Sequence, residues 1–435
     1  MPINRLPPEI FALVVTFFKG RQLIKMTAVC KYWRTTLLSF PLLWNKIRCS
    51  GIEQFEEYLE RSKFAPLEVQ LGRPDPDRLR LLLPQISRLA SLDVWVGGPY
   101  AFRWISHYLR NPMPTFHKFS ITTYFGLDTL AYPSGVVNDH LLHVKKLCLN
   151  GMTRFRAPGV FPHVTELKWC VGSGAPVQVT GLLATMEQLP ALEQVEILFE
   201  VGHGYTTTSP VPSVVTLPHV QQVALRCSDD SGIPHVLQFL NLPSLTSLVV
   251  DMVPILPWSL PTLPVTSFNK HLPNFAELQA MRVYMCREYG RVSFRSRSQA
   301  SFEYYARARP LGKTPYHHDR ELWGSLPLHS VRRLVVTMDR WEKGVEDEWL
   351  LGLFRDLRSL ENLELEGYCG HTMRNLRQMM TQRDLAPTIK TLTVNSETDD
   401  VRQALKLKNV ADGLGLGIVV TCCERKYRLG GLIIS

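Results

Sequence analysis

Apolar residues recur along most of this chain in a short phrase, φ-x-x-φ-x-φ, in which φ is apolar and x is any residue. Clear copies are VKKLCL from Val144, LTSLVV from Leu245 and IKTLTV from Ile389. Apolar residues at every second position predict a short β-strand with one buried face. The phrases begin at Phe64, Leu89, Phe116, Val144, Val164, Leu192, Val220, Leu245, Leu278, Val331, Leu360 and Ile389.

Most successive phrases start 25 to 29 residues apart, and segments such as 181–189 between them have a helical pattern. A strand and a return segment, repeated, predict a parallel sheet. The pattern resembles degenerate leucine-rich repeats. That resemblance implies an α/β solenoid with strands on its concave face and helices and loops outside. The asparagine that this family carries eight residues after the first apolar position is missing, for example at Gly97 and Met152.

The N-terminal stretch 6–44 has a different pattern, with helical spacing and many large apolar residues. Pro7 and Pro8 predict the start of a helix that Gly20 ends. A second helical piece begins near Leu23, and Thr27 is the predicted N-cap of a third. Three or four short helices with this excess of apolar side chains cannot bury all of them alone.

The runs LPPEI from Leu6 and VCKYWR from Val29, followed by PLLW ending at Trp44, resemble the F-box, especially the F-box-like segment of fungal proteins. The resemblance implies a helical module that binds the Skp-type adaptor of a cullin-RING ubiquitin ligase. The positions carried over as adaptor-binding are Leu6, Pro7, Ile10, Leu13, Leu23, Val29, Cys30 and Trp33. Trp33 and Trp44 are also suited to an internal core. We therefore expect an all-α F-box at 1–48 and a repeat domain at 49–435.

Alternation along each strand also predicts which side chains point away from the buried leucines and form the concave face. The predicted target-binding residues on it are Trp95, Lys146, Lys168, Glu196, Arg226, Asp251, Arg282, Tyr284, Arg333 and Glu364. Both signs of charge occur together with aromatic rings, which favours a protein partner over a uniform polyanion.

A gap of 53 residues separates the phrases at Leu278 and Val331 and predicts a basic insertion or an irregular repeat at about 286–326. Within it, 287–320 carries eight Arg and Lys against three Asp and Glu, with interleaved aromatic residues. Three interpretations are open: a solvated loop packed by its aromatics, a basic surface for acidic or phosphorylated protein, and a nucleic-acid arm. The loop is favoured and nucleic acid is the least favoured.

The cysteine pattern and the absence of signal or membrane-spanning segments narrow the expected compartment and chemistry of the protein. The net charge is +10, and the nine cysteines are scattered without metal-ligand spacing, as in a reducing compartment. No segment has the pattern of a signal peptide or a membrane span, so we expect an intracellular protein, cytoplasmic or nuclear. We expect no metal, no cofactor and no catalysis. The predicted function is a substrate-recognition subunit of a Skp-cullin-F-box ubiquitin ligase that contacts the cullin scaffold through the adaptor. The alternative is an adaptor-binding scaffold without ligase activity.

Overall fold

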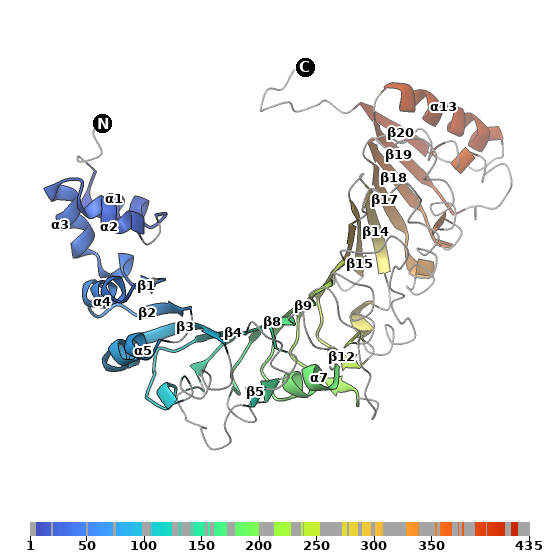
Figure 1. Ribbon diagram of the computed structural model, residues 1–435. Helices are drawn as coiled ribbons and strands as arrows, with labels where there is room; N and C mark the ends of the chain where they lie inside the picture. Colours follow the sequence, from blue (N-terminus) through green and yellow to red (C-terminus); the bar gives the residue numbers. More distant parts are fainter. Residues whose placement is uncertain are drawn as a thin grey trace. The chain divides into compact units, whose positions relative to one another are not determined.

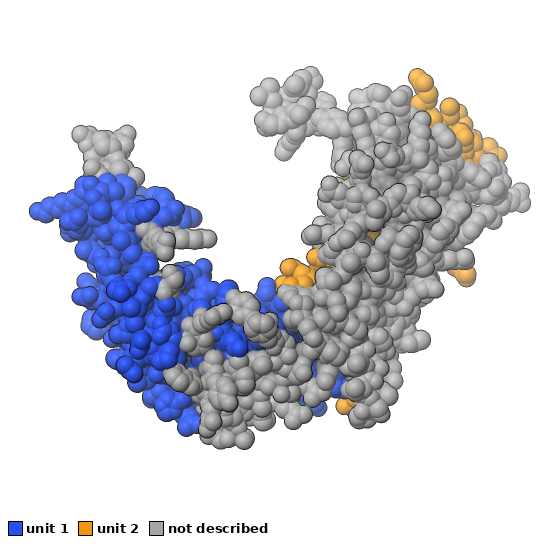
Figure 2. All heavy atoms as spheres, in the orientation of Figure 1, with its two compact units in different colours: residues 1–195, 206–208 blue, residues 196–205, 209–435 orange. Residues whose placement is uncertain are grey.

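The computed structural model of the chain describes its N-terminal helices, a series of strands and parts of the segments between them. The described residues are 6–18, 21–48, 51–72, 75–97, 105, 107–123, 130–131, 141, 143–152, 155–156, 161–171, 179–199, 213–227, 236–237, 239–252, 272–275, 278–285, 289–296, 301–307, 328–338, 353–354, 357–367, 373, 376–377, 388–396, 398–413 and 419–424. The chain divides into two compact units, Met1–Val195 with Thr206–Thr208 and Glu196–Tyr205 with Ser209–Ser435 (Figure 2).

The first unit begins with a helical module. Its elements are α1 (Pro8–Val15), α2 (Arg21–Thr27), α3 (Lys31–Ser39) and the 3-10 helix η2 (Pro41–Leu43). The helix predicted to start at the two prolines is confirmed, with Pro7 as its N-cap, but it ends at Val15. Thr27 was wrongly predicted to cap the third helix. Thr27 is instead the last residue of α2, where its hydroxyl donates to the Ile24 carbonyl at 2.7 Å, and extended Cys30 is the N-cap of α3.

The next elements attach this module to a sheet. Strand β1 (Lys46–Ile47) pairs in parallel with β2 (Leu67–Leu71), and helix α4 (Ile52–Arg61) lies between them in sequence. The Asn45 amide donates to the Pro66 carbonyl at 2.9 Å, and the Glu68 N–H donates to the Asn45 carbonyl at 2.9 Å. The module's own last residues therefore form the first strand of the sheet.

The rest of the first unit continues the parallel sheet in the order β1-β2-β3-β4-β6-β8 (Figure 1). Its elements are α5 (Pro76–Leu82), η3 (Leu83–Arg88), β3 (Leu89–Val96), β4 (Lys118–Thr123), β6 (Lys146–Asn150), β8 (Glu166–Val171) and α7 (Val179–Glu187), with a separate small pair of β5 (Leu130–Ala131) and β7 (Phe155–Arg156). Helix α7 confirms the helical pattern predicted for 181–189.

The strand order in the second unit is β9-β11-β13-β16-β15-β14-β17-β18-β19-β20, and β9 starts two residues before the unit boundary. The elements are β9 (Gln194–Phe199), β10 (Val215–Thr216), β11 (Gln222–Cys227), β12 (Leu240–Asn241), β13 (Ser247–Met252), η6 (Pro273–Phe275), β14 (Leu278–Met285), β15 (Tyr289–Ser296), β16 (Ser301–Arg307), η8 (Leu328–Ser330), β17 (Arg333–Met338), β18 (Asn362–Gly367), β19 (Thr391–Ser396), α13 (Thr398–Gly413) and β20 (Val419–Glu424). Strands β10 and β12 pair with each other in a separate small sheet. In the large sheet, β9, β11, β13, β14, β17, β18 and β19 overlap copies of the repeated phrase, and β15, β16 and β20 pair with these strands.

Where two phrases form paired strands they match position by position, so that Lys146 faces Glu166 and Arg333 faces Asn362. A recurring hydrogen bond fixes this register. The carbonyl of the second residue of a phrase accepts two N–H groups of the next phrase, as Lys145 does from Thr165 at 2.9 Å and Glu166 at 3.0 Å. The apolar positions whose side chains the structure describes are buried in the strands that follow these phrases. Phe64 departs from this rule, and its predicted place was wrong: it is 93% exposed, because Lys63 before it takes a positive φ of 46° and Ala65 is buried in its place.

The long interruption is part of the sheet. Strands β15 and β16 run back and forth between β14 and β13, so that β15 is antiparallel to both of its neighbours and β16 is parallel to β13. Val292 and Phe294 are buried. The loop interpretation is therefore wrong for 289–296 and 301–307. Residues 308–320 lie outside the described part of the chain.

Candidate functional site

Helix α1 has two apolar faces, of which only one is covered. Phe11, Ala12 and Val15 are buried, and the Phe11 ring lies 4.8 Å from the Trp33 ring. Ile10, Leu13 and Val14 follow at i, i+3 and i+4, the spacing of one helical face, and Phe17 lies in the turn after the helix. They are all exposed, Leu13 by 62% and Phe17 by 83% of the residue's reference area. Phe18 after α1 and Val29 after α2 are exposed as well, and we call these six residues together the uncovered apolar face.

This face contains several residues that the sequence assigned to adaptor binding. Pro7, Ile10, Leu13 and Val29 are exposed, whereas Leu6, Cys30 and Trp33 are half-buried. Leu23 is 4% exposed and belongs to the module's core. Sequence reasoning left Val14, Phe17 and Phe18 out of the site, although the spacing of Val14 and Phe17 from Ile10 would have placed those two on the same face.

Several large apolar residues exposed on one short module are typical of a protein-binding site. Residues 3–50 match the family model described as F-box-like. This is an F-box-like segment. F-box domains bind Skp-type adaptors, so the match indicates an adaptor-binding role of the Skp-cullin-F-box kind. The F-box-like segment also contains β1, so it extends into the sheet. No curated protein matches the chain.

Trp44, the last tryptophan of the F-box-like segment, holds the module to α4. Its side chain is fully buried, and its indole N–H donates to the Leu37 carbonyl at 2.9 Å. The ring meets Tyr58 edge-on with centroids 5.2 Å apart, and the Arg61 guanidinium lies 4.4 Å from the ring centre. Trp44 is therefore a core residue that fixes the module against the sheet.

The first unit carries a polar sheet face built from residues that alternate with the core. Across β3, β4, β6 and β8 they form three rows at matched register. The rows are Ser91, Lys118, Lys146 and Glu166; Asp93, Ser120, Cys148 and Lys168; and Trp95, Thr122, Asn150 and Cys170. Together with Lys46, Arg48 and Glu68 we call these residues the first-unit face. Three predicted target-binding residues, Trp95, Lys146 and Lys168, lie on it.

Two groups on the first-unit face have shifted pKa values. Burial raises the pKa of the Asp93 carboxyl, against a hydrogen bond from Ser120 and the positive charges of Lys118 and Arg48, which lower it. Burial also raises the pKa of the Cys148 thiol, against Lys118 and Lys168. A thiol with a raised pKa is a poor nucleophile at neutral pH, so Cys148 is not a candidate for covalent chemistry.

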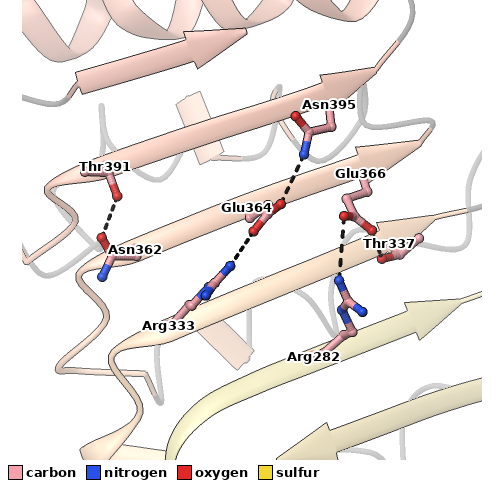
Figure 3. A network of polar contacts seen from close by, with 8 residues as sticks. All are labelled: Arg282, Arg333, Thr337, Asn362, Glu364, Glu366, Thr391 and Asn395. Atoms are coloured by element: carbon pink, nitrogen blue, oxygen red, sulfur yellow. Dashed lines mark hydrogen bonds and ion pairs between the residues drawn. The ribbon is translucent and has the colours of Figure 1, made fainter. Parts of the chain in front are cut away.

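The corresponding face of the second unit is cross-linked by its own side chains (Figure 3). Arg333 donates to Glu364 at 3.0 Å, and the Asn395 amide donates to the other oxygen of Glu364 at 3.1 Å. Arg282 reaches across β17 to Glu366 at 3.7 Å, and Glu366 also accepts from the Thr337 hydroxyl at 2.7 Å. These residues enclose Val335, which lies between Arg282 and Glu364 in register and is 6% exposed.

The remaining predicted target-binding residues also lie in the second unit. Glu196 on β9 pairs with Arg226 on β11 at 3.4 Å. Asp251 lies on β13, and Tyr284 lies on β14 with its side chain outside the described atoms. Alternation thus placed these residues on the correct strands, but it did not show that Arg226, Arg282, Arg333, Glu196 and Glu364 have partners within the chain.

Among the described residues, no group of three or more His, Cys, Asp or Glu side chains is arranged to hold a metal ion. Within the same part of the chain, no helix is both long and apolar enough to cross a membrane.

Proposed function

We propose that this protein is the substrate-recognition subunit of a Skp-cullin-F-box ubiquitin ligase. The observation that carries the proposal is the uncovered apolar face on α1 within an F-box-like segment. The adaptor covers this face and links the chain to a cullin scaffold. The target protein binds the polar face of the sheet, which we interpret as the concave face of a leucine-rich-repeat-like solenoid.

In this function the chain performs no chemistry of its own. It holds the adaptor at one site and the target at another, which raises the effective concentration of the target near the ubiquitin-transferring subunit. The support is geometric: Trp44, β1 and Asn45 join the F-box-like segment to the first strands within one compact unit. A flexible link would dilute this effect, because effective concentration falls as the reach of the linker grows.

Adaptor binding is tested with Leu13→Asp/Phe17→Asp in the full chain. Each change places a charge in the proposed interface, and both side chains are exposed in the free chain, so the fold should persist. We expect adaptor affinity to fall by 100-fold or more, because the loss of two buried apolar anchors and the burial of charge each cost about 2 kcal/mol or more. Binding is measured by calorimetry with the purified Skp-type adaptor, and folding by circular dichroism.

The matched control is Phe64→Asp, since Phe64 is 93% exposed and lies outside the module. It should leave adaptor binding unchanged. Equal affinity of Leu13→Asp/Phe17→Asp and the unaltered chain would refute adaptor docking at this face. The alternative function, a scaffold without ubiquitination, is tested in cells. A bound protein whose lifetime is the same with and without the Leu13→Asp/Phe17→Asp changes would favour the scaffold.

A further inference from the structure

Most of the chain's net positive charge lies in the F-box-like segment. Residues 3–50 contain eight Arg and Lys and one Glu, a formal net charge of +7, whereas the whole chain has +10. The remainder of the chain therefore sums to only +3. Because Glu9 is the single carboxylate residue of the segment, the segment cannot neutralise its cations internally. Positive charge at this density favours a partner of opposite sign.

Three of these cations lie where α2 meets α3, two helices that pack against each other (Figure 1). Lys25 lies in the last turn of α2, Lys31 is the first residue of α3, and Arg34 follows three residues later, on the same helical face as Lys31. The Arg34 Nε donates at 2.9 Å to the carbonyl of Thr27, the last residue of α2. We call Lys25, Lys31 and Arg34 the cationic edge.

The two lysines of this edge are available to an incoming anion. Lys25 and Lys31 are exposed, and neither forms an ion pair or a side-chain hydrogen bond with any residue that the structure describes. Lys46, at the end of the segment, differs from them because it pairs with Glu68 at 3.7 Å. A carboxylate that approaches Lys25 or Lys31 therefore displaces no partner within the described part of the chain.

The cationic edge borders the uncovered apolar face. Val29 belongs to that face, is 59% exposed and lies between Lys25 and Lys31 in the sequence. Its N–H donates to the Met26 carbonyl at 3.2 Å, and the Ala28 N–H donates to the Lys25 carbonyl at 3.1 Å. These bonds hold Val29 in the turn that ends α2. Apolar residues bordered by charged ones are the usual arrangement of a protein interface.

We propose that the adaptor surface that covers the uncovered apolar face carries acidic side chains opposite Lys25 and Lys31. This inference rests on the proposed function and names the chemistry of the partner's surface. Exposed ion pairs add little to affinity, so the apolar residues supply most of it. The charges act instead on the encounter, because complementary charges at the border of an interface raise the association rate constant.

An anionic membrane is the other surface that attracts a basic module with exposed apolar residues. A helix that binds a membrane surface carries Lys and Arg on its polar face. Helix α1, which presents Ile10, Leu13 and Val14, contains neither Lys nor Arg and carries Glu9 in its first turn. The position of the cations at α2 and α3 therefore favours a protein with a local acidic patch.

The test follows the association of the purified Skp-type adaptor with the full chain by surface plasmon resonance. We expect the association rate constant to fall as salt is raised, because salt screens exposed charges. Lys25→Gln/Lys31→Gln should lower this constant about tenfold at low salt and change the dissociation rate constant little. Lys25→Arg/Lys31→Arg keeps the charges and should retain the rate of the unaltered chain.

The matched control is Lys406→Gln/Lys408→Gln on α13, which removes two exposed lysines and changes the net charge by the same amount. It should leave the association rate constant unchanged. An equal fall in the control, or no fall in Lys25→Gln/Lys31→Gln, would overturn the inference. Tighter binding of phosphatidylserine vesicles than of the adaptor, lost in Lys25→Gln/Lys31→Gln, would assign the cationic edge to a membrane instead.

The same measurements separate this inference from the proposed function. Adaptor binding at a rate that neither salt nor the changes at Lys25 and Lys31 alter refutes the acidic adaptor surface alone. Absence of adaptor binding by the unaltered chain refutes the proposed function itself.

Discussion

Trp44 connects the F-box-like segment to the sheet, and replacing it tests this connection. Trp44→Ala removes the indole N–H bond to Leu37, the edge-on contact with Tyr58 and the cation–π contact with Arg61. These contribute about 1 kcal/mol each. The cavity left by a fully buried tryptophan brings the total to about 3–5 kcal/mol. Trp44→Phe keeps an aromatic ring but removes the indole donor of the Leu37 carbonyl, which keeps only the longer bond from the Phe40 N–H at 3.4 Å, and should cost about 1 kcal/mol.

Hydrogen exchange measured by mass spectrometry on the full chain localises the effect. In Trp44→Ala, amide protection should fall about 100-fold or more in peptides that cover 52–61 and 44–48, because both segments lose their packing on the indole. Phe64→Ala serves as the control and should leave protection unchanged, since its side chain is 93% exposed. Unaltered protection of 52–61 in Trp44→Ala would show that the module is not held to α4 through this residue.

Two further predictions concern the first unit. Gly151 has a φ of +77°, and a Cβ there would lie 2.0 Å from the Thr123 carbonyl oxygen. Gly151→Ala should therefore destabilise the chain by about 2 kcal/mol or more, whereas Gly97→Ala, with open space around it, should change the stability little. Similar thermal unfolding of the two variants would contradict this prediction. Because the pKa of Asp93 is raised, the folded state holds its proton more tightly than the unfolded state, and stability falls as pH rises from about 4 through the folded pKa. Asp93→Asn should remove that loss and gain stability relative to the unaltered chain between about pH 4 and 7 in denaturant titrations; parallel pH curves would refute the assignment.

The parallel strands were predictable because one rule governs them. Apolar residues two apart must share a buried face, and equal spacing brings phrases into register, as the pairing of Lys146 with Glu166 shows. The strands β15 and β16 were missed because they run as an antiparallel hairpin that need not repeat the phrase. Phe64 was misplaced because a pattern of residue types does not register the positive φ of Lys63.

The candidate sites were predictable in part for a similar reason. Helical spacing finds the exposed face of α1, but which of its two apolar faces is buried depends on contacts with Trp33, which lies in another helix. Alternation places Arg282 and Glu364 on a sheet face. Their ion-pair partners come from other strands. Arg282 on β14, for example, reaches across β17 to Glu366 on β18. Such pairing depends on side-chain reach across the sheet and leaves no pattern in the sequence.

The position of β1 links the two proposed binding sites physically. Lys46 and Ile47 belong to the F-box-like segment, yet they pair with Glu68 and Val69 of the sheet, and Ile47 is fully buried. A boundary after residue 48, as the sequence suggests, would separate hydrogen-bonded strands and uncover the edge of β2. An edge strand exposed in this way is prone to aggregation. The F-box-like segment and the first-unit face therefore belong to one compact unit, and in the proposed function a target bound to that face keeps a fixed direction relative to the adaptor on α1.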